Sequence, residues 1–307
     1  MKHEKELMVT CFIINREKIL ELDNTLTNLI NENMNNDKLS SIMLSPLLYY
    51  SNKLTMPIII SGYLVMATLY LQSVFFMIRQ FKNNAESRIY ILPYPTVYPY
   101  NIEGGSLLWV LHWIWETLCQ FAFVQVGCTS DNLFGYYAIN IVAQFRVLSY
   151  EIEYTNTDNY DEKQIRRFHE YFVIKHHKII ECCEILEYIN GPIVLAMTVS
   201  TALILCTLIF QVNQMENITM GQMAFLAVYI WYKLMQAFLY AWAGEEIKIA
   251  NEALRMAVYN SNWENNNTKL NSTYINMLLN QKCISIRACG LVEISAELFA
   301  KVLEKID

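Results

Sequence analysis

Residues 220–263 decide how the rest of this chain is interpreted; they read MGQMAFLAVYIWYKLMQAFLYAWAGEEIKIANEALRMAVYNSNW. Their first part, residues 220–243, is apolar apart from Lys233 and two glutamines. At about 1.5 Å per residue, a helix of this length crosses a hydrocarbon layer of about 30 Å. The chain then becomes amphipathic, with apolar residues at helical spacing: Ile247, Ala250, Leu254 and Val258. The stretch predicts a membrane-spanning helix that continues directly into an amphipathic helix outside the membrane.

The composition of the whole chain points to the same class. Of its 307 residues, 54% are hydrophobic and 17% are charged, against about 25% charged residues in soluble proteins. The nine glycines and six prolines are too few for a β-rich architecture. We therefore expect an all-α fold, that of a polytopic helical membrane protein. The predicted spans are at about residues 54–78, 105–127, 190–212, 220–243 and 283–303.

The segments between the spans predict long amphipathic helices in the cytoplasm. Residues 128–189 and 244–282 form this helical anchor region, and residues 1–53 lie on the same side. The whole chain, residues 1–307, is expected to form a single membrane helical bundle.

The distribution of Lys and Arg sets the orientation, because these residues favour cytoplasmic loops. Fifteen lie in residues 1–53, 150–189 and 244–282, which are expected inside, against three in residues 79–104 and none in residues 213–219. The N-terminus is therefore predicted to be cytoplasmic. The sequon Asn217-Ile218-Thr219 then lies outside and predicts glycosylation of Asn217.

Several short matches relate this chain to a known family. Residues 240–244 read YAWAG, residues 257–259 read AVY, and Trp263 follows. After a polar insertion, residues 279–282 read LNQK and residues 288–290 read ACG. In this order the matches resemble the C-terminal hallmark of insect odorant receptors. These are seven-helix olfactory receptors that act as odour-gated cation channels.

The resemblance implies a function and a cellular setting. It implies a subunit that binds a small volatile odorant and gates a cation channel together with a co-receptor subunit. It also implies the plasma membrane of an olfactory neuron, in its dendrite. Since the family has seven spans and five are predicted here, we expect a copy truncated at both ends. The alternatives are a gustatory receptor of the same superfamily and a small-solute membrane transporter, although the Gly- and Pro-broken repeats of transporters are absent from the sequence.

Three stripes of side chains at the outer ends of the spans are candidates for the ligand pocket. In the second span, four residues at i, i+3, i+4 and i+7 share one helix face: Trp109, His112, Trp113 and Glu116. Tryptophans at a helix end also mark the lipid interface, so packing is the alternative. A pocket for a volatile needs aromatic area with one or two polar groups, and the resemblance implies a pocket among these outer halves. The other candidates are Tyr70, Ser73 and Met77 in the first span and Gln222, Leu226 and Tyr229 in the fourth.

The last predicted span carries two carboxylates on one face, because Glu293 and Glu297 are at i and i+4. In the resembling channels this helix lines the ion path, where carboxylates would favour cations. The alternative is a helix end that is simply solvated.

The sequence favours no enzyme, cofactor or nucleic-acid function. It shows no nucleophile with a paired base. His169, His176 and His177 share a helical segment, but their spacing lacks the dense His boxes of di-iron membrane enzymes. Lys and Arg form no basic stripe. We expect no cofactor, no metal and no nucleic acid; the expected partners are the co-receptor, an odorant and lipid.

The topology makes a direct prediction. Cysteines introduced into residues 1–53 and 244–282 should react with a membrane-impermeant thiol reagent only after the cells are permeabilised, because both segments are cytoplasmic. Cysteines introduced into residues 213–219 should react in intact cells. Labelling near Asn262 from outside an intact cell would overturn this orientation.

Overall fold

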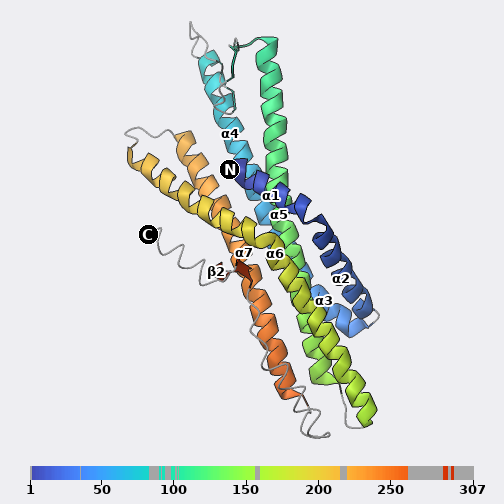
Figure 1. The fold of residues 1–307 in the computed structure, drawn as a ribbon. Coiled ribbons are helices and arrows are strands. Elements are labelled where there is room, and N and C mark those ends of the chain that lie inside the picture. The colour runs from blue at the N-terminus through green and yellow to red at the C-terminus, as the bar shows by residue number, and fades with distance from the viewer. Residues whose placement is uncertain are drawn as a thin grey trace.

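The computed structural model describes residues 2–34, 36–82, 90, 92–93, 98–100, 102, 104–155, 160–214, 220–261, 286–289 and 292–293. Long helices dominate this part of the chain (Figure 1). The helices are α1 (Lys2–Ile14), α2 (Arg16–Met34), α3 (Asp37–Tyr50), α4 (Met56–Lys82), α5 (Leu107–Tyr154), α6 (Glu162–Gln214) and α7 (Met220–Asn260), with one π-helical turn, Ser51–Thr55, between α3 and α4. Two short strands follow, β1 (Arg287–Ala288) and β2 (Val292–Glu293). The predicted all-α class is confirmed.

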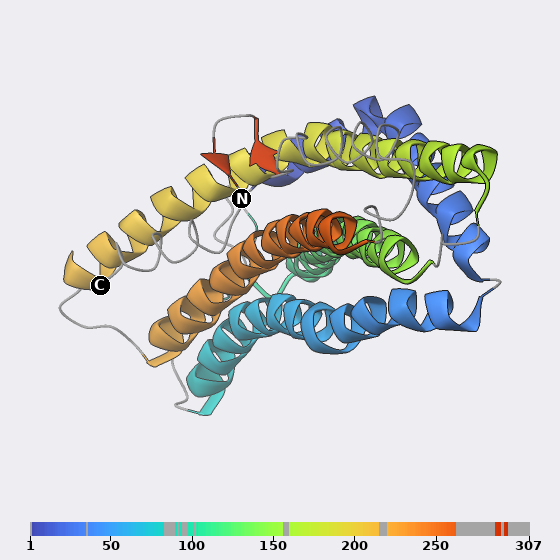
Figure 2. The ribbon, with the colours of Figure 1, turned by 90° about the horizontal axis from the view of Figure 1, so that it is seen from below.

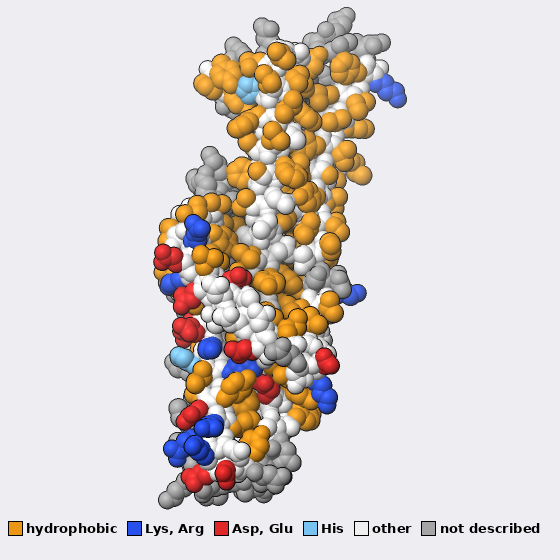
Figure 3. All heavy atoms as spheres, turned by 90° about the vertical axis from the view of Figure 1, so that its right-hand side faces the viewer, with side chains coloured by type: hydrophobic (Ala, Val, Ile, Leu, Met, Phe, Trp, Pro, Cys, Tyr) orange, Lys and Arg blue, Asp and Glu red, His pale blue; other side chains and the backbone are white. Residues whose placement is uncertain are grey.

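Three helical stretches of the described residues are long and apolar enough to cross a membrane: Asp37–Lys82, Leu107–Tyr154 and Met223–Asn260. They include the spans expected in the first, second and fourth positions. The span expected at residues 190–212 forms the C-terminal part of α6. Hydrophobic side chains cover the upper half of the molecule in Figure 3, whereas charged side chains gather over its lower half.

The helices α5, α6 and α7 each run without a break from an apolar half into a polar half. α7 packs along α5 and against α4, and Figure 2 shows α7 lying between α4 and α6. α6 packs on α5 together with α1 and α2. The amphipathic pattern at the end of α7 is confirmed, because the side chains that it predicted to be apolar and inward-facing are buried: Ile247, Ala250, Leu254 and Val258.

The π-helical turn joins α3 and α4 into one continuous helix and lies beside a close contact with α5. The hydroxyl of Tyr50, the last residue of α3, donates a hydrogen bond to the carbonyl of Asn132 at 3.1 Å. The Tyr50 ring stacks on Trp242 of α7, with ring centroids 6.2 Å apart and planes 7° apart. Gly135 lies directly against Tyr50, and any side chain there would overlap the hydroxyl. This junction fixes α3, α5 and α7 to one another at a single point.

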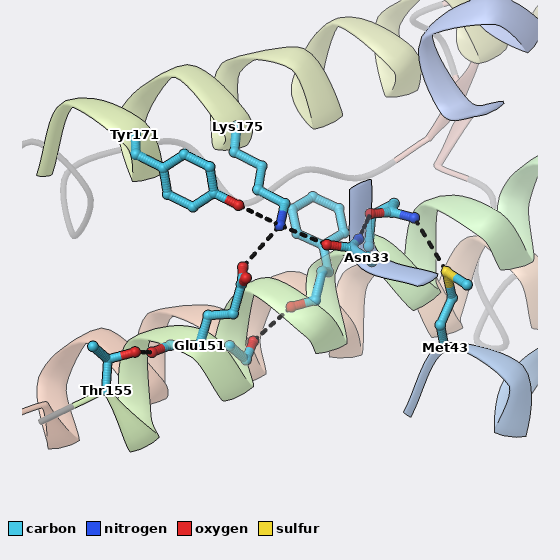
Figure 4. A network of polar contacts seen from close by, with 9 residues as sticks. Asn33, Met43, Glu151, Thr155, Tyr171 and Lys175 are labelled. Carbon is cyan, nitrogen blue, oxygen red and sulfur yellow. Dashed lines mark hydrogen bonds and ion pairs between the residues drawn. The ribbon is translucent and has the colours of Figure 1, made fainter. Parts of the chain in front are cut away.

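A buried lysine holds the polar half together (Figure 4). Lys175 of α6 is 3% exposed, and its ammonium donates to Asn33 of α2 at 3.0 Å and to Tyr171 at 3.0 Å. It also pairs with the Glu151 carboxylate of α5 at 2.8 Å. Asn33 in turn donates to Gln144 of α5 at 2.8 Å. The network therefore satisfies a buried charge and joins three helices that are far apart in sequence.

The expected fifth span, residues 283–303, is wrong at the residues that the structure describes. Here β1 and β2 pair antiparallel, with Arg287 opposite Glu293, instead of continuing a helix. Cys289 adopts a left-handed backbone with φ of 52°, which a right-handed helix excludes. A Cβ added to Gly191 of α6 would lie 3.0 Å from the Cys289 amide nitrogen, so a larger residue there would push this backbone away by a few tenths of an ångström. The rest of the predicted span lies outside the described residues.

The Lys175 network predicts a large and specific loss of stability. Lys175→Met would leave the Glu151 carboxylate and the Asn33 carbonyl without their buried donor, at a cost of about 2 kcal/mol. The melting temperature of the purified protein in detergent should fall by several degrees. Adding Glu151→Gln should recover part of the loss, because the unpaired charge is then removed.

The matched control is Lys178→Met, three residues along the same helix, where the side chain is exposed. Its melting temperature should stay within about a degree of the parent, because exposed substitutions usually change stability by less than about 0.5 kcal/mol. Equal losses from both substitutions would show that the network contributes nothing specific.

Candidate ligand-binding site

Aromatic rings cluster between the C-terminal part of α4 and the N-terminal part of α5. Tyr70 of α4 meets Trp113 of α5 edge to face, with ring centroids 5.7 Å apart and planes at 72°. One turn further out, Trp109 makes a similar contact with Tyr90, with centroids 5.5 Å apart. Such pairs bury large apolar areas in a defined geometry. The structure thus brings together two of the predicted stripes, at Tyr70 and Trp113.

The polar members of the α5 stripe bind tyrosines from the segment before the helix. Glu116 is buried and accepts a hydrogen bond from the Tyr98 hydroxyl at 2.9 Å. His112 Nδ1 lies 2.7 Å from the Leu108 carbonyl, which can only accept, so this nitrogen carries the hydrogen. In the neutral ring, Nε2 then accepts from the Tyr100 hydroxyl at 2.7 Å. The two tyrosines therefore hold the preceding segment against α5.

Two indole N–H groups on this helix are buried without a hydrogen-bond acceptor in the described part of the chain. They are Nε1 of Trp109 and Nε1 of Trp113. A buried donor that has lost water and gained no partner costs about 1–3 kcal/mol. A ligand with an oxygen acceptor would remove that cost if it reached either indole.

A small cavity of about 30 Å³ lies deeper along the line where α4, α5 and α7 meet. We call this line the seam. The volume suits one or two water molecules or the polar end of a ligand. The cavity is lined from four helices by Met8, Gly62, Val65, Gln120, Val124, Gly127, Tyr229, Tyr232, Lys233 and Gln236.

A chain of buried polar groups forms one wall of the cavity and continues beyond it. Lys233 donates to the Gln236 side-chain oxygen at 3.1 Å. The amide nitrogen of Gln236 donates to one oxygen of Asp131 on α5 at 2.8 Å, and Tyr240 donates to the other at 3.0 Å. All four residues are at most 3% exposed. The chain connects a cation in α7 to an anion in α5 through one amide.

The other predicted residues have different surroundings. Ser73 is buried and donates to the Leu69 carbonyl at 3.3 Å, whereas Met77 and Leu226 are half-buried. Tyr229 is 7% exposed, lines the cavity and stacks on Phe225, with ring centroids 5.9 Å apart. Asn217 and Glu297 lie outside the described residues, and the side chains of Gln222 and Glu293 are likewise not described.

Of the residues that line the cavity, all except Tyr229 were absent from the predicted site residues, although the sequence carried a signal for some of them. Gln120 and Lys233 are polar side chains inside otherwise apolar segments, which marks them as facing protein or a cavity. Met8 and Gly62 gave no such signal, because an apolar or absent side chain suits lipid, packing and cavity equally.

Of the three histidines in this segment, His176 belongs to the core of the polar half, whereas His177 is exposed. His176 is 5% exposed and its ring lies 6.3 Å from that of Phe145. Burial lowers the pKa of His176 to about 4, with a smaller contribution from His177. The ring is therefore neutral near pH 7 and packs as an uncharged side chain.

Comparison with known proteins now identifies the family. A family model described as 7tm Odorant receptor matches residues 8–305. The chain belongs to the odorant receptor family. The family predicted from residues 240–290 is thereby confirmed, and this odorant receptor chain is a helical membrane protein.

Two curated relatives from Drosophila melanogaster show how much of an odorant receptor is present. Odorant receptor 47a is 25% identical over 174 residues, which cover 56% of this chain and 43% of the relative. Odorant receptor 13a is 22% identical over 227 residues, which cover 69% of this chain and 54% of the relative. The chain spans about half the length of these relatives.

A solved odorant receptor has the same fold. The insect olfactory receptor OR5 from Machilis hrabei, solved in complex with eugenol, superposes with a TM-score of 0.77. The superposition covers 99% of this chain and 76% of that one, at 17% sequence identity. The arrangement of the helices is therefore that of an insect olfactory receptor.

Proposed function

We propose that this chain is the odorant-binding subunit of a ligand-gated cation channel and that its ligand lies along the seam of α4, α5 and α7. The observation that carries the proposal is the cavity bordered by Tyr229 and Tyr232, directly below the aromatic cluster of Tyr70 and Trp113. Family membership supplies the class of activity. The ligand position is inferred from this geometry.

The two parts of the seam are close enough for one small molecule to touch both. Trp113 and Gln120 are seven residues apart on α5, which is about 10 Å along the helix. Between them lies the buried Glu116, already bonded to Tyr98. Aromatic walls with a few polar groups are what a small volatile ligand requires. The eugenol complex of the Machilis hrabei receptor supports a ligand of similar size here.

Continuous helices offer a route from the ligand to the rest of the channel. α5 and α7 both line the cavity and both continue into the polar half, where Arg146 of α5 pairs with Glu246 of α7 at 3.0 Å. A ligand that separates or tilts these helices in the apolar half therefore moves the polar half as well. In this proposal the channel is completed by the family's co-receptor subunit.

The proposed setting follows from the same family. The channel would lie in the plasma membrane of an olfactory neuron dendrite, with the N-terminus in the cytoplasm and Asn217 glycosylated outside. The excess of Lys and Arg in the segments placed inside supports this orientation.

The pocket assignment predicts which aromatic residues matter. Trp113→Ala and Tyr229→Ala should each raise the half-maximal odorant concentration at least tenfold, because losing about 1.4 kcal/mol of contact energy has that effect. Dose–response recordings and surface expression should be measured together. Expression should barely change if the rings face a ligand.

The matched control for the pocket is Trp115→Ala. Trp115 is on the same helix but is 64% exposed, so its removal should leave the odorant response unchanged. Equal shifts for all three variants, or failure of all three to reach the surface, would contradict the assignment.

The proposed assembly predicts a dependence on the co-receptor. Cells expressing this chain together with the co-receptor should show an odorant-evoked cation current in whole-cell recordings. Cells expressing the chain alone should show none, because the proposed channel needs both subunits. A current from the chain alone would refute the co-receptor requirement, and the absence of any current from the pair would refute the proposed function.

A further inference from the structure

One wall of the cavity comes from a helix outside the three candidate spans. Met8 of α1 lines the cavity, whereas the other lining residues belong to α4, α5 and α7. α1 itself packs on α5 and α6. Among residues 8–14 of this helix, Met8 is the one buried side chain, and its neighbour Val9 is 41% exposed. α1 therefore reaches the interior of the bundle through Met8.

Met8 is buried without belonging to the main hydrophobic core. Its side chain is 2% exposed, but it is absent from the two clusters that buried apolar side chains form in the described part of the chain. The same is true of three other apolar lining residues: Val65, Val124 and Tyr229. The surroundings of Met8 are therefore those of the cavity and not those of the core.

The cavity of about 30 Å³ holds a polar group of a few atoms and not a whole odorant. Gln120 offers an amide to such a group, so the apolar body of a ligand has to fit against Val65, Val124 and Met8. Valine is branched at Cβ and stiff. Methionine is unbranched, has three rotatable bonds and adapts to its neighbours. Met8 is therefore the apolar wall that can give way to a ligand, and its size limits the room.

We propose that Met8 sets the greatest length of ligand that the seam accepts. This inference rests on the proposed function and names a residue that determines the specificity of the same site. Met8→Ala removes about three heavy atoms, and the surroundings of a truncated side chain relax only partly. The released space adjoins the cavity and so extends the ligand site. Enlarged apolar cavities of this kind bind apolar groups.

The test measures the binding of straight-chain primary alcohols from butanol to decanol, because a hydroxyl can both donate and accept at the polar lining. Dissociation constants are measured by calorimetry on the purified chain in lipid nanodiscs, with the heat of partition into empty nanodiscs subtracted. In the parent, affinity should rise about fourfold with each added carbon and stop rising at a limiting length. In Met8→Ala this length should increase by about two or three carbons. An alcohol about three carbons beyond the parent's limiting length should bind at least tenfold more tightly to Met8→Ala than to the parent.

Three further variants test whether the effect belongs to the size of this side chain. Met8→Leu nearly conserves the volume and should keep the limiting length of the parent. Val9→Ala truncates the exposed neighbour and should leave the whole series unchanged. Met8→Val shortens the side chain less than alanine does and should increase the limiting length by about one carbon. Met8→Val replaces Met8→Ala in the test if Met8→Ala does not fold.

The outcomes separate this inference from the proposed function. An unchanged limiting length in the alanine and valine variants, while short alcohols still bind, would overturn the role of Met8 and leave the ligand site in place. An equal increase in Val9→Ala would do the same, and so would a parent series that rises through decanol. A uniform loss across the series in every Met8 variant, Met8→Leu included, would assign Met8 to packing instead. Failure of every alcohol to bind the parent would count against the proposed ligand site itself.

Discussion

Backbone N–H and C=O groups inside a hydrocarbon layer must find their partners within the protein, and this constraint shapes the molecule. A helix satisfies it locally, so the apolar segments form helices whatever surrounds them. The same helices continue past their apolar halves, since α5 and α7 run on through Tyr154 and Asn260. Because α5 and α7 are each one unbroken helix, the candidate site and the polar half share the same elements.

Each half of the molecule contains one buried lysine, Lys175 in the polar half and Lys233 in the apolar half, and their surroundings differ. Lys175 pairs directly with Glu151 and ties together helices of the polar half, where several donors and acceptors surround it. Lys233 is linked to Asp131 through the amide of Gln236 and borders a cavity. The first lysine therefore joins helices to one another, whereas the second lies beside a space between helices.

The periodicity of the sequence predicted what local physics controls. The apolar positions of α7 from Ile247 to Val258 are buried as expected, and Trp113 faces the seam with Tyr70 as its stripe indicated. Features that depend on distant segments were not predictable in this way. Met8 reaches the cavity only through the tertiary packing of α1. The strand pair at β1 depends on the left-handed Cys289 and on its contact with Gly191, and a hydropathy pattern reports neither.

The π-helical turn at Ser51–Thr55 is a place where a change of chain length would alter the lining of the cavity without a substitution in the cavity itself. A π turn accommodates an additional residue relative to an α turn. A single-codon deletion there would rotate α4 by about 100° relative to α3. Gly62 and Val65 would leave the seam and their neighbours would replace them. The same deletion within α5 would also rotate the polar half of α5 relative to its apolar half. A change of length is therefore tolerable in the π-helical turn and damaging in α5.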